Sequence, residues 1–90
     1  MLVAVRDVEI VNRLGLHARP AMQFVETANR FRSTVTVRKG DEKVNGKSIM
    51  EMMMLAAMPG TILRIEAAGD DAAPCLDALA KLIAEKFHED

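Results

Sequence analysis

The hydrophobic pattern of this chain switches repeatedly between two periods, and this switching limits which folds the chain can adopt. Val35 and Val37 stand two residues apart among polar neighbours, which is the period of a strand with one buried face. Near the C-terminus the apolar residues recur at helical spacing: Leu76, Leu79, Ala80, Ile83 and Phe87. The whole pattern predicts strands over residues 2–11, 33–38, 43–45 and 61–67 and helices over residues 18–30, 48–57 and 73–87, in the order βαββαβα.

The helix expected between the first two strands constrains the arrangement of the sheet. A strand–helix–strand crossover leaves its two strands parallel. The strand over 61–67 can lie between them, antiparallel to both, and Gly40-Asp41 predicts a hairpin that joins 33–38 to 43–45. We therefore expect an α+β fold: an open-faced, two-layer sandwich with a four-stranded antiparallel sheet and all three helices on one face.

Size and composition fit one small domain. Ninety residues, half of them hydrophobic, can bury a core without help from disulfides or metal ions, so residues 1–90 are expected to form a single domain. One cysteine excludes an internal disulfide and favours a reducing compartment. The N-terminal residues are charged too early for a signal peptide, and no apolar run is long enough to span a membrane. We expect a cytoplasmic protein without membrane insertion.

The charge is nearly balanced overall but uneven along the chain. A net charge of −1 provides no basic field, so nucleic-acid binding is not expected. The first fifty residues carry nine Lys or Arg against five Asp or Glu, whereas residues 51–90 carry three against eight. Two interpretations stay open: a mildly basic face that attracts an acidic partner, or an imbalance without function on a solvated surface.

The motif GLHARP, which begins at Gly15, lies between the first strand and the first helix. Gly15 lets the backbone turn, and Pro20 suits a first helical turn, where amides have no intrahelical acceptor. His17 is therefore expected at or just before a helix N-terminus. The amides of Ala18 and Arg19 are free there, and both the helix dipole and the guanidinium favour an anion.

This arrangement predicts an imidazole beside a site for phosphate. Imidazole offers a neutral, nucleophilic nitrogen near neutral pH, and a phosphoryl group on that nitrogen is readily passed on. The combination suits a relay better than a hydrolase. The alternative is that His17 is only an N-cap or an exposed loop residue, although Gly15, Arg19 and Pro20 favour the functional interpretation.

Two motifs together resemble the HPr family, the histidine-containing phosphocarriers of the bacterial phosphoenolpyruvate-dependent sugar phosphotransferase system. They are GLHARP around His17 and VNGKSIM, which runs from Val44 to Met50. The resemblance covers the chain from about Val8 to about Phe87. It implies the same open-faced sandwich, with strand order 1-4-2-3.

The resemblance also implies a function and partners. Enzyme I, charged from phosphoenolpyruvate, would phosphorylate Nδ1 of His17, and the group would pass to a histidine of an Enzyme IIA domain for sugar uptake. Ala18 and Arg19 would bind the phosphate, so His17 and Arg19 are the expected catalytic residues. No cofactor or metal is expected, and the protein is a phosphoryl carrier rather than a self-sufficient enzyme. A surface that meets several partners favours a monomer.

Ser48 and Glu51 match a capping box, in which Ser accepts from the N3 amide and Glu reaches back to the N-cap amide. In many bacteria the matching Ser of HPr is phosphorylated by an ATP-dependent HPr kinase/phosphorylase. A phosphate there would add charge beside Glu51 in the partner-binding face and oppose docking. Many members of the family have Gly in place of Glu51, so the modification of Ser48 stays open.

The second expected helix is apolar on nearly every side, and a two-layer fold cannot bury all of it. Exposed apolar patches usually mark contact surfaces, and flexible Met side chains suit several partners. The resemblance implies that Ile49, Met50 and Met53 face outward beside His17 as a docking face. Core filling is the alternative, and we expect it for about half of this apolar run.

Few other residues suggest chemistry. Residues 69–71 are expected to be a loop with helix-capping residues. Cys75 is expected at an ordinary helix position rather than as a thiol with a lowered pKa, and His88 in a solvated, charged tail over 85–90. His17, His88 and Cys75 lack metal-ligand spacing, so no metal site is expected.

Two other roles are alternatives to the sugar carrier. The protein could act mainly in regulation through Ser48, within a partial or nitrogen-related phosphotransferase system. The order βαββαβα also suits small ligand-binding modules of ferredoxin-like shape, since a fold alone does not give a function. In that case His17 and Arg19 would be incidental.

Overall fold

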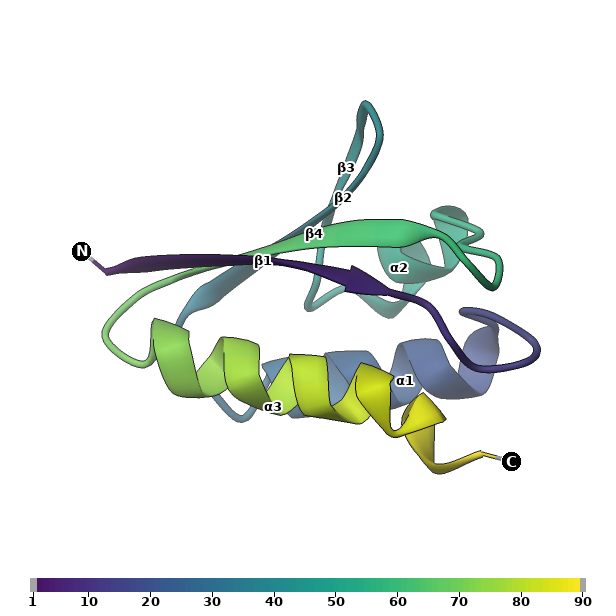
Figure 1. The fold of residues 1–90 in the computed structure, drawn as a ribbon. Coiled ribbons are helices and arrows are strands. Elements are labelled where there is room, and N and C mark those ends of the chain that lie inside the picture. Colours follow the sequence, from purple (N-terminus) through teal and green to yellow (C-terminus); the bar gives the residue numbers. More distant parts are fainter. Residues whose placement is uncertain (1, 90) are drawn as a thin grey trace.

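The computed structural model describes residues 2–89 and has the predicted order of elements (Figure 1). The strands are β1 (Val3–Glu9), β2 (Thr34–Lys39), β3 (Glu42–Asn45) and β4 (Ile62–Ala68). The helices are α1 (Ala18–Ala28), α2 (Ile49–Met54) and α3 (Ala72–Ala84), and a short 3₁₀ turn, η1 (Lys86–His88), follows α3. Predicted and observed boundaries differ by at most three residues.

The four strands form one antiparallel sheet in the order β1-β4-β2-β3. β4 lies between β1 and β2, with Leu63 opposite Val8 on one side and Ile65 opposite Val37 on the other. α1 and α3 run side by side along one face of the sheet, α2 packs against α1, and the other face is open (Figure 1). The predicted open-faced α+β sandwich with strand order 1-4-2-3 is confirmed.

The core lies between the helices and the inner face of the sheet, and the two hydrophobic periods predicted most of it. The buried strand residues are Val35, Val37, Leu63, Ile65 and Ala67. The buried helix residues include Ala21, Phe24, Val25 and Ala28 from α1, Met52 from α2, and Cys75, Leu76, Leu79, Leu82 and Ile83 from α3. β1 departs from the pattern, because Val3 and Val5 are exposed on the open face.

The last helix ends earlier than the periodicity predicted. α3 ends at Ala84 rather than at residue 87, and Lys86, Phe87 and His88 then have φ angles of 58°, 55° and 60°. This turn still puts Phe87 in the core, where its exposure is 1%. Periodicity could not reveal the change, because an apolar residue at 87 is buried in either conformation.

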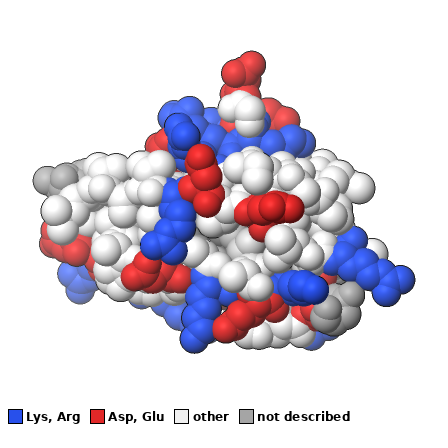
Figure 2. Space-filling view, in the orientation of Figure 1, with Lys and Arg blue, Asp and Glu red and all other residues white. Residues whose placement is uncertain are grey.

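Charged side chains from the two halves of the sequence pair in the fold. Arg6 contacts Asp77 and Arg38 contacts Glu66, each at 2.8 Å. On the face drawn in Figure 2, Lys and Arg alternate with Asp and Glu and do not gather in one area. The uneven charge along the sequence is therefore partly cancelled in space, and this face is not a basic one.

Asp71 immediately precedes α3, but its side chain does not cap that helix as we expected for residues 69–71. Its carboxylate instead accepts hydrogen bonds from the amides of Arg32 at 2.8 Å and Ser33 at 2.9 Å, and from the Ser33 hydroxyl. Asp71 thus ties the loop after α1 to the start of α3. The hydrogen bond from the Ser33 side chain is the main cause of the lowered pKa of Asp71, and the Arg32 amide adds to it.

We expect Asp71→Asn to lower the free energy of unfolding at neutral pH. In acid, the difference in free energy of unfolding between the variant and wild type should become smaller. A carboxyl whose pKa is lowered in the folded state stabilises the fold above its unfolded pKa, about 3.9, and this contribution is lost as the pH falls through the folded pKa. Urea unfolding at about pH 7, about pH 5 and about pH 3 tests this. Asp70→Asn, at an exposed position one residue earlier, is the control. A difference in free energy of unfolding between Asp71→Asn and wild type that stays constant with pH contradicts the expectation.

The remaining minor predictions can be compared directly with the structure. Cys75 is buried, and desolvation raises the pKa of its thiol, so it lacks the activated character that a helix N-terminus can confer. His88 is exposed, with its Nδ1 3.6 Å from Oε1 of Glu85. No helix within residues 2–89 has the length and apolar character needed to cross a membrane.

Candidate functional site

Gly15 fixes the loop that leads into α1. Its φ is +71°, and a Cβ at this position would lie 2.6 Å from the carbonyl oxygen of Ala57, so both the turn and the close approach require glycine. The same carbonyl accepts a 2.8 Å hydrogen bond from the amide of Leu16. The loop before His17 is therefore held against the segment that follows α2.

His17 lies at the N-cap of α1, with an extended backbone. Its carbonyl accepts the first hydrogen bond of the helix, from the amide of Ala21 at 3.0 Å, so the amides of Ala18 and Arg19 precede the hydrogen-bonded part of the helix. The imidazole does not cap the helix, and 39% of the side chain is exposed. The predicted position of His17 at a helix N-terminus is confirmed, with Ala18 and Arg19 exposed beside it.

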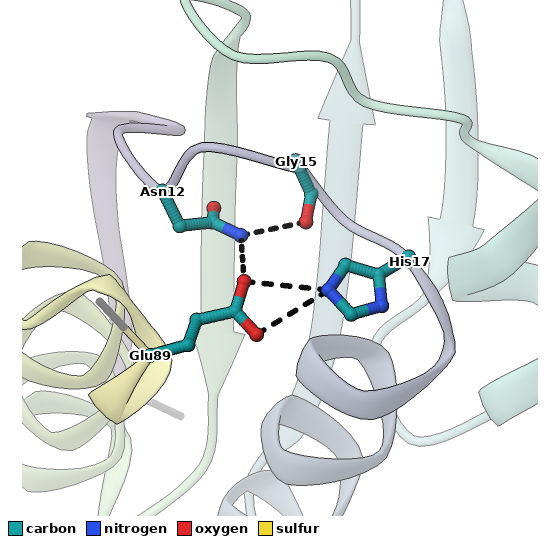
Figure 3. Close-up of polar contacts among 4 residues, drawn as sticks. All are labelled: Asn12, Gly15, His17 and Glu89. Carbon is teal, nitrogen blue, oxygen red and sulfur yellow. Dashed lines mark hydrogen bonds and ion pairs between the residues drawn. The ribbon is translucent and has the colours of Figure 1, made fainter.

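The imidazole of His17 contacts a residue from the other end of the chain (Figure 3). Both carboxylate oxygens of Glu89, which follows η1, lie 3.3 Å from Nε2 of His17. Oε1 of Glu89 also accepts a 2.7 Å hydrogen bond from the side-chain amide of Asn12, which donates to the Gly15 carbonyl at 2.7 Å as well. The other ring nitrogen, Nδ1, lies on the side of the ring away from Glu89 (Figure 3).

The carboxyl of Glu89 is held in its charged form. The hydrogen bond from Asn12 is the main cause of its lowered pKa; His17 and the charge of Arg19 act in the same direction, against partial desolvation. Because a carboxylate only accepts hydrogen bonds, Nε2 of His17 carries the proton in this contact. Among residues 2–89, no three His, Cys, Asp or Glu side chains are grouped so that they could hold a metal ion.

Sequence reasoning missed Asn12 and Glu89. We expected residues 85–90 to form a solvated tail, and no pattern relates position 89 to position 17. Asn12 had one available signal: it lies in a loop three residues before Gly15, where Asn side chains often bond to nearby backbone.

Ser48 caps α2 as predicted, since its hydroxyl accepts from the amide of Glu51 at 3.2 Å. The reciprocal half of the predicted capping box is wrong. The Glu51 carboxylate accepts from the amide of Asn45 at 3.0 Å, while the amide of Ser48 donates to the carbonyl of Asn45 at 3.1 Å. Glu51 therefore ties the start of α2 to the end of β3.

The exposed side of α2 carries the residues expected to form a docking face. Ile49, Met50 and Met53 are 41%, 74% and 45% exposed, whereas Met52 and Leu55 are fully buried. Fewer members of the apolar run fill the core than the half that we expected. α2, the N-terminal end of α1 and η1 lie at the same end of the molecule (Figure 1).

Comparison with known proteins identifies the family to which the chain belongs. The family model described as the PTS HPr component phosphorylation site matches residues 4–85. The chain belongs to the HPr family. It is a phosphocarrier of the phosphotransferase system, and the resemblance carried by GLHARP and VNGKSIM is confirmed. Membership implies Enzyme I and Enzyme IIA as partners.

Individual relatives of the HPr family agree along nearly the whole chain. The phosphocarrier protein HPr of Neisseria meningitidis serogroup A is 50% identical over 84 residues, which are 93% of this chain and 94% of the relative. A crystal structure of HPr from Thermoanaerobacter tengcongensis has a TM-score of 0.93 and 45% identity, and the match covers 97% of this chain and 98% of that one. An HPr dimer from the same organism has a TM-score of 0.78 and 48% identity, with coverage of 91% and 94%.

Proposed function

We propose that His17 is the residue of this chain that carries the phosphoryl group, accepting it on Nδ1 from Enzyme I and giving it to an Enzyme IIA domain for sugar uptake. The observation that carries the proposal is the placement of the ring. The imidazole is partly exposed at the N-cap of α1, next to the amides of Ala18 and Arg19, which have no acceptor among residues 2–89. Those amides and the Arg19 guanidinium bind the phosphoryl oxygens, which the helix dipole also favours.

The transfer needs little covalent chemistry from the protein. The lone pair of Nδ1 attacks phosphorus, the Nδ1–P bond forms, and the bond between phosphorus and the donor atom of Enzyme I breaks with its electron pair leaving on that donor atom. Negative charge on the three phosphoryl oxygens meets Ala18 and Arg19 as the group arrives. The chain is thus a substrate of its partners and has no metal or cofactor requirement of its own in this proposal.

The exposed side of α2 provides the contact with both partners. Ile49, Met50 and Met53 are exposed at the end of the molecule where α1 begins. Flexible, polarizable Met side chains can fit two different surfaces in turn. Residues 1–90 act as one HPr-like domain and as a cytoplasmic monomer, because a carrier has to present the same face to donor and acceptor.

The reaction with Enzyme I tests this function. Incubation with phosphoenolpyruvate and Enzyme I is expected to add one phosphoryl group per chain by intact mass, and the group should be lost in acid, as expected for phosphate on imidazole nitrogen. Addition of an Enzyme IIA domain should remove it from the chain. A chain that gains no phosphate from an active Enzyme I, or gains an acid-stable one, contradicts the proposal.

We also propose regulation at Ser48, through an HPr kinase/phosphorylase that uses ATP. The hydroxyl lies at the N-cap of α2, immediately before Ile49 and Met50, so a phosphate there adds negative charge to the docking face. Glu51 already places a carboxylate beside Ser48. A mainly regulatory role in a partial or nitrogen-related system is the second candidate function, and this site favours it.

We expect Ser48→Asp to slow phosphoryl transfer from Enzyme I by about three- to tenfold relative to Ser48→Asn. Asp and Asn both cap helices well, so the pair differs in charge and not in the stability of α2. A negative charge added at a docking face opposes association through its desolvation cost and through repulsion of like charges. Single-turnover transfer from phosphorylated Enzyme I measures the effect. Equal rates for the two variants would show that charge at Ser48 does not control docking.

A further inference from the structure

We propose that Glu89 is a positioning residue for phosphoryl transfer: its carboxylate holds the His17 ring with the proton on Nε2 and the lone pair on Nδ1. The inference rests on the proposed role of His17. It starts from the two 3.3 Å contacts between Nε2 and the oxygens of Glu89. Figure 3 shows that these contacts leave the Nδ1 side of the ring clear of Glu89.

The turn before Glu89 brings its carboxylate to His17. Lys86, Phe87 and His88 all have φ between 55° and 60°, a region that residues with a Cβ rarely adopt, least of all three in succession. Phe87 anchors the turn because its side chain is buried in the core. The direction in which the chain leaves this anchored turn is therefore defined, and Glu89 does not belong to a solvated tail.

Asn12 fixes the same carboxylate independently of the imidazole. Asn12 is fully buried, and both protons of its side-chain amide are used, one for the Gly15 carbonyl and one for Oε1 of Glu89. Exchanging the oxygen and nitrogen of this amide would place its oxygen against two acceptors, so its orientation is determined. Its Oδ1 has no hydrogen-bond partner within residues 2–89. One buried side chain thus holds both Glu89 and the loop that leads to His17.

This arrangement suits the charge change in the reaction. When Nδ1 of His17 attacks phosphorus and the bond from phosphorus to the donor breaks, the ring becomes an imidazolium that keeps its proton on Nε2. No proton has to leave or arrive. The carboxylate of Glu89 then faces a cation, and the hydrogen bond to Nε2 strengthens, as a carboxylate behind a nucleophilic or metal-binding histidine generally does. Glu89 acts through His17 and does not touch the phosphoryl group.

The alternative to positioning is that the same contact lets Glu89 shield His17 from an incoming phosphoryl group. A carboxylate near the site repels an incoming phosphoryl group, and the carrier would then work faster without it. The geometry favours positioning, because both oxygens of Glu89 lie at Nε2, while Nδ1 lies on the side of the ring away from Glu89 (Figure 3). The two effects predict rate changes of opposite sign.

The test compares Glu89→Gln with Glu85→Gln in the full chain. Glu85 is an exposed carboxylate of the same segment and contacts His88, so its replacement removes the same charge without touching His17. We expect Glu89→Gln to lower the single-turnover rate of transfer from phosphorylated Enzyme I by about fivefold, and Glu85→Gln to change it by less than about twofold. The Nε2 proton of His17, observed by NMR, should exchange faster with water in Glu89→Gln only.

Each outcome of these two measurements supports or overturns the positioning role of Glu89. A slower rate together with faster exchange of the Nε2 proton supports positioning by Glu89. An unchanged rate, a faster rate, or a slower rate with an unchanged Nε2 proton overturns it. A wild-type chain that accepts no phosphate on His17 overturns the proposed function as well, whereas equal rates in wild type and Glu89→Gln overturn only the positioning role.

Discussion

We expect His17→Ala to abolish acceptance of the phosphoryl group from phosphoenolpyruvate and Enzyme I while leaving the fold intact. The imidazole is the nucleophile in our account, and the amides of Ala18 and Arg19 bind phosphoryl oxygens but cannot themselves form a bond to phosphorus. Intact mass after incubation with active Enzyme I measures acceptance. His88→Ala, which removes the exposed histidine of the C-terminal turn, is the matched control and should accept phosphate at the wild-type level.

The same substitution should cost little stability. The His17 side chain makes no cap to α1 and is 39% exposed, and its contact with Glu89 is a partly exposed one. Loss of such contacts changes the free energy of unfolding by less than about 1 kcal/mol. Urea unfolding of the variant checks this. Acid-labile phosphate on His17→Ala, or a variant that no longer folds, contradicts this account of the residue.

The second large effect is expected at Gly15, where Gly15→Ala should destabilise the fold by about 2–4 kcal/mol and also slow phosphoryl transfer. Part of the cost is conformational, because a residue with a Cβ is strained at φ +71°. The rest is steric, because the Cβ would lie 2.6 Å from the carbonyl oxygen of Ala57. Relief of that clash has to move the loop that positions His17, so stability and transfer should fall together.

Gly40→Ala separates the two causes. Gly40, in the hairpin between β2 and β3, has a φ of +56°, but a Cβ there would meet nothing within 4 Å. Its cost should therefore be the conformational one alone, about 1 kcal/mol, with no change in transfer. Urea unfolding and single-turnover transfer on both variants measure the difference. Equal losses of stability at Gly15 and Gly40 would show that the contact with Ala57 is unimportant.

The layers of the fold were predictable because alternating burial is a local property of the chain. On β4, Leu63 and Ile65 are buried while Arg64 is exposed, and this alternation is visible in the sequence itself. The ends of elements were less accessible. The exit from α3 at Ala84 depends on how Phe87 meets the core, which no residue near position 84 reveals.

The candidate site likewise contains residues that have a local sequence signal and residues that have none. His17 was found because the glycine before it and the proline after it act on the backbone within a few residues. The contact between His17 and Glu89 joins positions 72 apart, and that between Asn12 and Glu89 joins positions 77 apart, so neither has a local signature. Glu51 was assigned to the wrong amide for a similar reason: its partner, Asn45, belongs to the end of a neighbouring strand.

The most direct test of the central claim is to locate phosphorus on the ring of His17. Uniformly ¹⁵N-labelled chain, phosphorylated with Enzyme I and phosphoenolpyruvate, should show a one-bond coupling between phosphorus and Nδ1 of His17, with Nε2 still bearing a proton. A chain that carries phosphate but shows no such coupling at His17, with the group on Ser48 or His88 instead, contradicts the account.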